Sequence, residues 1–321
     1  MMIALSYEKQ RKGGETVSAS MMDGSKIPVI VPSRFHAYAC DTQRKFSSAA
    51  TVDFIADSGF DGLDLSLDLF TDLGNPFCVE GDIYSVLYSL GNRAKNRGLT
   101  IPSCHLPFYM PNPDDKAAMK PFIRGLTEGI KAAAYLNIPA AVIHPIVRHS
   151  SVCNYNRWKE ENLAFLSPLC DLARQKGVTL CIENMTGIPY PHQPRELVFG
   201  SRAKDIRWLA DKLDTGICWD FGHANLTGLC QSAELHTVGD RLHMVHIHDN
   251  NARTDNHLLP FDGDVDWADA SEGLRAIGYG SMAWRCLNME IKTSHLPSDI
   301  SAREAYAART LNAAKRLASL I

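Results

Sequence analysis

Residues 178–185 read Val-Thr-Leu-Cys-Ile-Glu-Asn-Met, and residues 216–221 read Gly-Ile-Cys-Trp-Asp-Phe. Each run is apolar on both faces of an extended strand and has a carboxylate close to its end. An amphipathic interval separates the two runs. Strands that are buried on both faces belong to parallel sheets covered by helices, so this stretch predicts two parallel strands joined by a helix.

The same alternation of strand and helix patterns repeats about eight times along the chain. The other strand candidates are Val29–Phe35, Gly62–Leu67, Ile101–Leu106, Ala140–Ile146, Leu242–Asp249 and Met282–Ile291. The helical pattern is clearest in Asp114–Leu136, and the last one covers Ala302–Leu320. A glycine or asparagine stands where several helices are expected to end, at Gly59, Gly98, Asn137, Gly177 and Gly278.

The predicted fold is a single (β/α)8 TIM barrel with its active site at the C-terminal ends of the strands. An open doubly wound sheet would want a G-x-G-x-x-G turn after its first strand, and the sequence has none. No linker or charge block divides the 321 residues. We therefore expect one barrel domain over residues 25–321, preceded by a poorly ordered N-terminal extension over residues 1–24.

The composition is that of an ordinary globular protein, with 45% hydrophobic residues, 21% charged residues and a formal net charge of −3. This charge balance argues against nucleic acid as the main partner and against an anionic membrane surface. No run of apolar residues is long enough to span a bilayer. Nine cysteines without a C-x-x-C pair suit a reducing compartment, so we expect a cytoplasmic protein.

Polar residues collect at the expected C-terminal ends of the strands, where barrel enzymes place their active sites. They are His105, His144, Glu183, Asp220, His223, His246, His248, Asp255, His257 and Glu290. Three of these carboxylates, Glu183, Asp220 and Glu290, cannot share one barrel mouth without a compensating cation. We therefore predict a divalent metal ion, with Mn or Zn favoured by mixed oxygen and imidazole ligands and Mg a weaker fit.

With these residues assembled, the chain from about residue 29 to residue 320 resembles the xylose-isomerase-like barrel superfamily. That superfamily includes sugar isomerases and epimerases and the endonuclease-IV-type apurinic endonucleases. The resemblance implies one metal ion held at the ends of strands five to eight by Glu183, Asp220, His246 and Glu290. His246 is preferred to His248 because the ligand histidine of the family is commonly followed three residues later by an acidic residue, here Asp249.

The resemblance favours an isomerase or epimerase that acts on a small keto or aldo sugar or a derivative of one. In such a reaction Glu183 and Glu290 remove and return a proton next to the carbonyl, and the metal ion stabilises the enediolate. The residues expected to contact the substrate are His105, His144, His223, His248, His257 and Trp219, with Phe108 and Tyr109 as apolar walls. We also expect a homo-oligomer, because barrels commonly form dimers or tetramers.

Two other reactions of the same superfamily stay open. The endonuclease branch holds three zinc ions with nine ligands, and the chain supplies all nine residue types in order, as His105, His144, Glu183, Asp220, His223, His246, Asp255, His257 and Glu290. The residues around them differ, since this chain reads Asp220-Phe-Gly-His223 where the nuclease pattern has Asp-Thr-Cys-His. Metal-dependent lyases that cleave carbon-linked glycosides share the barrel and the metal ligands, so a lyase is the third hypothesis.

Overall fold

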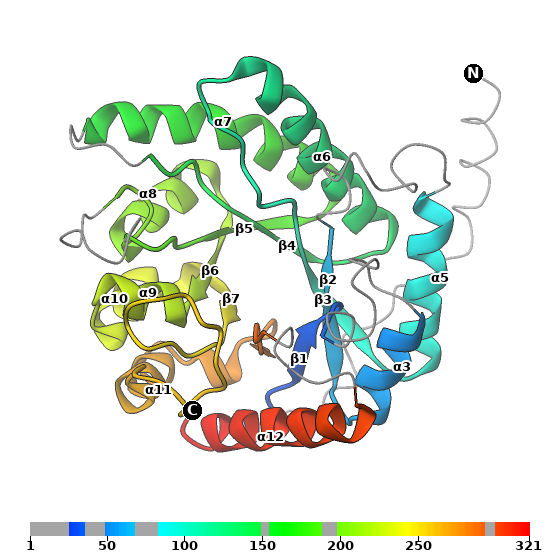
Figure 1. Ribbon diagram of the computed structural model, residues 1–321. Helices are drawn as coiled ribbons and strands as arrows, with labels where there is room; N and C mark the ends of the chain where they lie inside the picture. Colours follow the sequence, from blue (N-terminus) through cyan, green and yellow to red (C-terminus); the bar gives the residue numbers. More distant parts are fainter. Residues whose placement is uncertain (1–25, 36–48, 68–82, 149–153, 188–197, 293–298) are drawn as a thin grey trace.

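Eight parallel strands close into a barrel in which each strand pairs with its neighbours in chain order, and β1 pairs with β8 (Figure 1). A computed structural model describes residues 26–35, 49–67, 83–148, 154–187, 198–292 and 299–321. The prediction of a single (β/α)8 barrel is confirmed. The extension expected at residues 1–24 lies outside the described residues.

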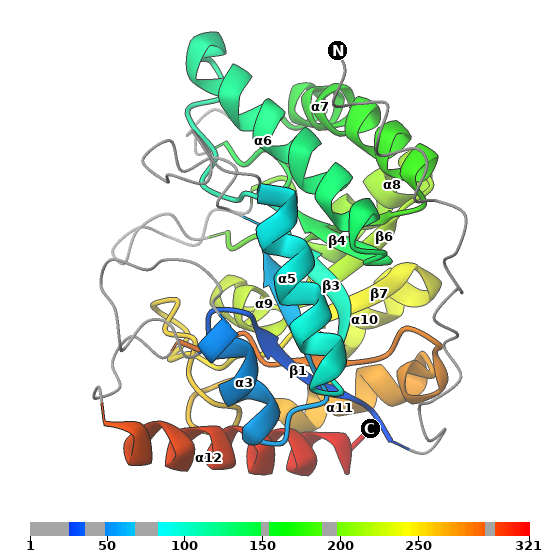
Figure 2. The ribbon, with the colours of Figure 1, turned by 90° about the vertical axis from the view of Figure 1, so that its right-hand side faces the viewer.

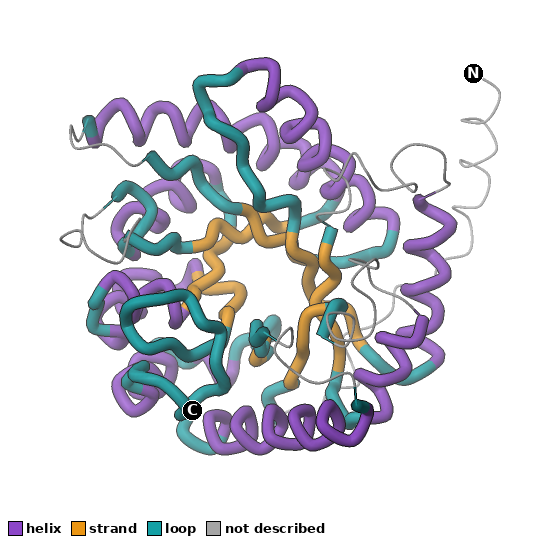
Figure 3. The backbone as a smooth tube through the Cα atoms, in the orientation of Figure 1, coloured by secondary structure: helices purple, strands orange, loops and turns teal. Residues whose placement is uncertain are grey.

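The strands are short and the helices surround them, as the tube in Figure 3 makes clear. The strands are β1 (Val29–Pro32), β2 (Gly62–Ser66), β3 (Thr100–His105), β4 (Ala140–Ile143), β5 (Thr179–Glu183), β6 (Gly216–Asp220), β7 (Leu242–His246) and β8 (Leu287–Asn288). The α-helices are α3 (Ala49–Asp57), α5 (Ile83–Asn96), α6 (Lys116–Tyr135), α7 (Tyr155–Lys176), α8 (Ala203–Leu213), α9 (Phe221–Thr227), α10 (Gln231–Val238), α11 (Trp267–Ala276) and α12 (Ile300–Ala318). Two 3₁₀ turns, η3 (Gly239–Arg241) and η4 (Tyr279–Ser281), precede β7 and β8. Figures 1 and 2 show α12 along the outside of the barrel, on the side of β1 and α3.

The helix ends lie where the sequence pattern predicted them. The five candidate residues Gly59, Gly98, Asn137, Gly177 and Gly278 all have positive φ, between 56° and 86°. In α7 the chain leaves the helix through Gly177 in the left-handed region, which a residue without a Cβ adopts at little cost. None of the helices in the described parts of the chain is long and apolar enough to cross a membrane.

The strands end earlier than their apolar runs predicted, and β8 differs most. The sequence predicted a strand over Met282–Ile291, but only Leu287–Asn288 pair with β1. The 3₁₀ turn η4 occupies the residues before Met282, and the indole N–H of Trp284 then donates to the backbone oxygen of Leu242 at 2.7 Å. The chain therefore reaches β8 through a turn rather than through an extended strand.

Candidate active site

A cavity of about 420 Å³ opens at the C-terminal ends of the strands. One side of it carries Glu183, the last residue of β5, and His223, Asp255, His257 and Glu290, which follow β6 to β8. The opposite side carries Arg34, Asp64, Ser66, His105 and Phe108, which belong to β1 to β3 and the turns after them. The cavity thus lies where a barrel enzyme binds its substrate.

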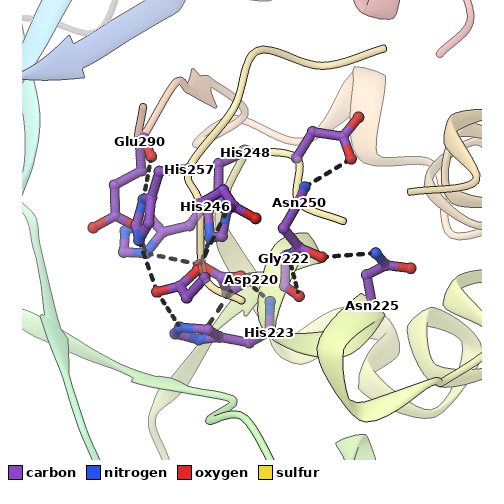
Figure 4. A network of polar contacts seen from close by, with 12 residues as sticks. Asp220, Gly222, His223, Asn225, His246, His248, Asn250, His257 and Glu290 are labelled. Carbon is purple, nitrogen blue, oxygen red and sulfur yellow. Dashed lines mark hydrogen bonds and ion pairs between the residues drawn. The ribbon is translucent and has the colours of Figure 1, made fainter. Parts of the chain in front are cut away.

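Four of the residues predicted to hold a metal ion converge beside this cavity (Figure 4 labels three of them). Nδ1 of His246 lies 3.1 Å from Glu290 Oε2, 3.3 Å from Glu183 Oε1 and 3.9 Å from Asp220 Oδ2. Ligands placed tetrahedrally around a zinc-like ion are about 3.3 to 3.6 Å apart. Neither ring nitrogen of the buried His246 makes a well-aligned hydrogen bond to a described residue. The donor set and its spacing therefore fit one divalent cation.

The two glutamates of this cluster are held in their ionised form. Burial alone would raise the pKa of Glu183, but the imidazoles of His246 and His144 hold it well below its usual range. Burial acts on Glu290 in the same way, and His246 and His257 hold its pKa well below the usual range. Both side chains are therefore ionised at neutral pH, which is the form that a base requires.

Backbone carbonyls fix the orientation of three histidines around the cluster. His105 Nδ1–H donates to Leu106 O at 2.8 Å, and His223 Nδ1–H donates to Asn184 O at 2.9 Å. His257 Nδ1–H donates to Glu290 O at 2.6 Å. A carbonyl oxygen only accepts, so Nδ1 carries the proton and Nε2 is the nitrogen left for a cation or a second proton. Figure 4 shows the contact of His257 with Glu290.

Ring nitrogens of these three histidines and of His144 lie close to carboxylate oxygens. His105 Nε2 lies 3.4 Å from Glu183 Oε2, and His144 Nε2 lies 3.1 Å from the same oxygen. His257 Nε2 lies 3.0 Å from Asp255 Oδ2, and His223 Nε2 lies 4.0 Å from it. The mouth of the barrel therefore offers cation-binding groups on both sides of the central cluster.

The structure places two expected substrate contacts away from the cavity, so both expectations are corrected. Trp219 is fully buried and donates its indole N–H to Gln231 Oε1 at 3.0 Å. Its neighbour Asp220 faces the barrel interior, and successive side chains of a strand alternate, so Trp219 faces the helices. His248 is also fully buried, with Nε2 3.1 Å from Asp220 Oδ2 and its ring stacked on His257 at 3.9 Å between centroids.

Gly222 makes the position of His248 possible. A Cβ on Gly222 would lie 1.9 Å from His248 Cε1, a distance that no side chain tolerates. His248 therefore supports Asp220 from behind instead of reaching a substrate (Figure 4).

Two residues for which the sequence predicted no role in the site, Asn184 and Asp249, hold it in place. Asn184 Oδ1 accepts from Asp220 N at 2.6 Å, and its Nδ2 donates to Asp220 O at 2.9 Å. Asp249 accepts four hydrogen bonds, from the backbone N–H groups of Asn250, Phe261 and Val265 and from the indole N–H of Trp267. These bonds shape the loop after β7 that carries Asp255 and His257. Asn184 follows the metal-ligand candidate Glu183 directly, which was the available signal.

Comparison with known proteins points to one family. Residues 52–316 match the family described as the xylose isomerase-like TIM barrel. An uncharacterized protein of Methanocaldococcus jannaschii is 32% identical over 191 residues, which cover 54% of this chain and 60% of that protein. An uncharacterized protein of Sinorhizobium fredii is 44% identical over 64 residues, which cover 20% of this chain and 21% of that protein. The matches thus span less than two thirds of the length of these curated relatives.

Solved structures match over nearly the whole chain. A D-tagatose 3-epimerase-like protein superposes with a TM-score of 0.68 and 20% identity, covering 92% of this chain and 98% of that one. A D-psicose 3-epimerase from Clostridium cellulolyticum, solved with D-tagatose, superposes with a TM-score of 0.67 and 15% identity, and the match covers 91% of this chain and 99% of that one. An L-ribulose 3-epimerase superposes with a TM-score of 0.67 and 16% identity, and the match covers 92% of this chain and 95% of that one. At these identities the likeness shows the shared fold.

Proposed function

Since this chain belongs to the xylose isomerase-like TIM barrel family, we propose that it isomerises or epimerises a small keto or aldo sugar, or a sugar derivative, with the help of a divalent metal ion. One observation carries the proposal. Two ionised glutamates, Glu183 and Glu290, each have an oxygen close to His246 Nδ1, at 3.3 and 3.1 Å, and both line the cavity. The sugar 3-epimerases among the similar structures support the choice of substrate.

The proposed ligands of this ion are Glu183, Asp220, His246 and Glu290, and Mn or Zn suits them best. When bound, the ion supplies positive charge that stabilises the enediolate of the substrate. One of Glu183 and Glu290 removes the proton from the carbon beside the carbonyl, and the other, or the same one, returns it. His144 and His223 line the cavity next to Glu183 and bind substrate hydroxyl groups.

A second candidate, zinc-dependent cleavage of DNA at abasic sites, is favoured by the groups beyond the central cluster. Asp255, His223 and His257 come together on one side, and His105 and His144 meet Glu183 on the other. These residues could hold further zinc ions. The glycoside lyase uses the same four central ligands, so it is separated from the isomerase only by its reaction.

Solvent exchange tests the principal proposal. Incubation of the metal-loaded protein with a keto sugar in deuterated water should place deuterium on the carbon beside the carbonyl, as read by NMR. Glu290→Gln keeps the shape but removes the basic oxygen, so exchange should fall at least ~10²-fold. Metal analysis of protein purified without chelator should give one ion per chain.

Abasic duplex DNA serves as the opposing substrate. Under the same conditions it should stay intact. Three zinc ions per chain and efficient nicking, with no deuterium entering any sugar, would establish the nuclease instead.

A further inference from the structure

Asp64 is a carboxyl group inside the barrel that the reaction described above does not use. It lies on β2, lines the cavity and is only 2% exposed. In the barrel register it pairs with Pro32 on β1 and Ser103 on β3. The next cavity-lining residue of β2, Ser66, pairs with His105, so Asp64 lies one step deeper in the barrel than that histidine.

The two oxygens of this carboxyl group have different surroundings. Oδ1 accepts a short hydrogen bond from Ser103 Oγ. Oδ2 makes no hydrogen bond to any residue that the structure describes, and no Lys or Arg among those residues pairs with Asp64. An unpaired buried carboxylate costs free energy, and burial accordingly raises the pKa of Asp64 against the opposing effect of His105 and His246. A group kept at such a cost, with one oxygen unused, suits a ligand that completes its hydrogen bonds.

The positions of the residues around the cavity indicate what kind of ligand this is. The four candidate metal ligands come from β5 to β8, whereas Asp64 and Ser66 come from β2 on the other side. A sugar whose carbonyl end lies between Glu183 and Glu290 extends into the remaining space, toward β1 and β2. The groups that it brings there are alcohol hydroxyls, which both donate and accept and therefore match a carboxyl group.

We propose that Asp64 is a substrate-binding residue that recognises a hydroxyl group of the sugar chain beyond the carbons at which the proton is transferred. Ser103 holds the carboxyl group through Oδ1 and leaves Oδ2 for the substrate. The inference rests on the proposed function, and it makes Asp64 a determinant of substrate length.

Two ketoses of different length test it, both followed by deuterium exchange in the manganese-loaded protein. D-Tagatose carries hydroxyl groups beyond the reacting carbons, and dihydroxyacetone has the carbonyl and its adjacent hydroxyls alone. For Asp64→Ala the ratio of kcat/KM for D-tagatose to that for dihydroxyacetone should fall at least ~10-fold, the loss expected for one hydrogen bond to a buried carboxyl group. Asp64→Asn keeps the shape and should lose less.

Asp61→Asn is the matched control, because Asp61 precedes β2 and bonds to Lys26 and to Val29 N outside the cavity. In this control the ratio of kcat/KM for D-tagatose to that for dihydroxyacetone should equal the ratio in the parent. Melting temperatures and metal content identify variants that fail to fold. An equal loss of kcat/KM for both ketoses in folded, metal-loaded Asp64→Asn would overturn the proposal. It would indicate that Asp64 acts in the proton transfer or stabilises the barrel instead of binding the distal part of the sugar. If the parent protein exchanges neither ketose and binds neither in calorimetry, the proposed function itself fails and the role of Asp64 falls with it.

Discussion

Asp205 is a buried carboxyl group whose environment disfavours its charged form. It lies in the first turn of α8, is 2% exposed, and accepts one hydrogen bond at Oδ2 from Gly200 N at 3.2 Å. Oδ1 is buried with no hydrogen-bond partner in the described ranges. Burial, with a smaller contribution from Glu234, raises the pKa of Asp205 from 3.8 to about 7 despite the bond from Gly200.

This shift makes folding stability depend on pH. Between about pH 4 and pH 7 the folded protein keeps a proton on Asp205 that the unfolded chain has lost, so the group destabilises the fold progressively as pH rises, by up to ~1.4 kcal/mol per unit. Asp205→Asn keeps an oxygen for Gly200 N. The free energy of unfolding of this variant minus that of the parent, measured by urea titration, should increase from about pH 4 to pH 7. Above pH 7 this difference should stay constant.

Asp269 provides a control of opposite sign. Burial raises its pKa, but hydrogen bonds from the hydroxyl and backbone of Ser232 outweigh burial and lower it. Asp269→Asn should therefore be less stable than the parent at neutral pH, and the difference should shrink only as pH falls below about 4, through the lowered pKa of Asp269. A flat difference between Asp205→Asn and the parent at all pH values would contradict the assignment.

His246 and His248 face the same side of the chain but have different surroundings. Nδ1 of His246 points at three carboxylates, whereas Nε2 of His248 contacts Asp220 alone among them. His246→Ala should lose the metal ion and all turnover. His248→Ala should keep most of the metal, because Asp220 Oδ1 still accepts a hydrogen bond from His223 N, and metal analysis per chain would show the difference between the two variants. Metal loss in the second variant only would show that His248 is the ligand.

The alternation of side chains along a strand explains which residue-level predictions the sequence supports. Cys218 and Asp220 face inward, so the same rule puts Trp219 outside the cavity, against the expectation that it contacts the substrate. Asp64 left a weaker signal, a lone carboxylate between Leu63 and Leu65. Its depth in the cavity depends on the register of β2 against β3, which the sequence does not reveal.

At the scale of elements, the loop between β7 and α11 depends on a single side chain. Asp249 is fully buried, and its two oxygens accept three backbone N–H groups and one indole N–H. Asp249→Asn would turn an amide NH₂ toward these donors. We expect a loss of about 2 to 4 kcal/mol in the free energy of unfolding, because buried donors lose their acceptor. Hydrogen exchange of residues 258–267 should accelerate.

A second carboxylate of the same loop serves for comparison. Asp262 is exposed and forms an ion pair with Arg309 on α12. Asp262→Asn should leave exchange in residues 258–267 close to that of the parent. Equal effects of the two substitutions would mean that Asp249 has no special part in the loop.

The ends of elements were predicted less well than their existence. Apolar runs continue past the last ladder pair because the residues after it stay buried, as Ile247 does after β7. The run from Leu242 to Asp249 therefore looked like one strand, whereas Asp249 forms an antiparallel bridge with Leu258. Helix ends were clearer, since positive φ restricts the residue type at Gly177 and Gly278.

For the whole molecule, the proposed metal site predicts that stability depends on metal. Glu183, Asp220 and Glu290 repel one another around His246, and a bound ion removes that repulsion. Addition of Mn²⁺ or Zn²⁺ at about 100 times its dissociation constant should stabilise the fold by about 2.7 kcal/mol, and chelation should reverse the gain. Thermal melts with and without chelator measure it. His246→Ala should show no shift, and an equal shift in that variant would point to a different binding site.

Closure of the barrel joins residues from opposite ends of the sheet. Val29 on β1 pairs with Leu287 on β8, and a single pair, His246 with Asn288, links β7 to β8. A ribosome makes seven strands before this one, so the nascent chain carries two open strand edges through most of its synthesis, the kind of surface that chaperones shield. Glu290 emerges just behind Asn288. The complete set of four ligand candidates therefore exists only once translation has supplied the strand that seals the barrel.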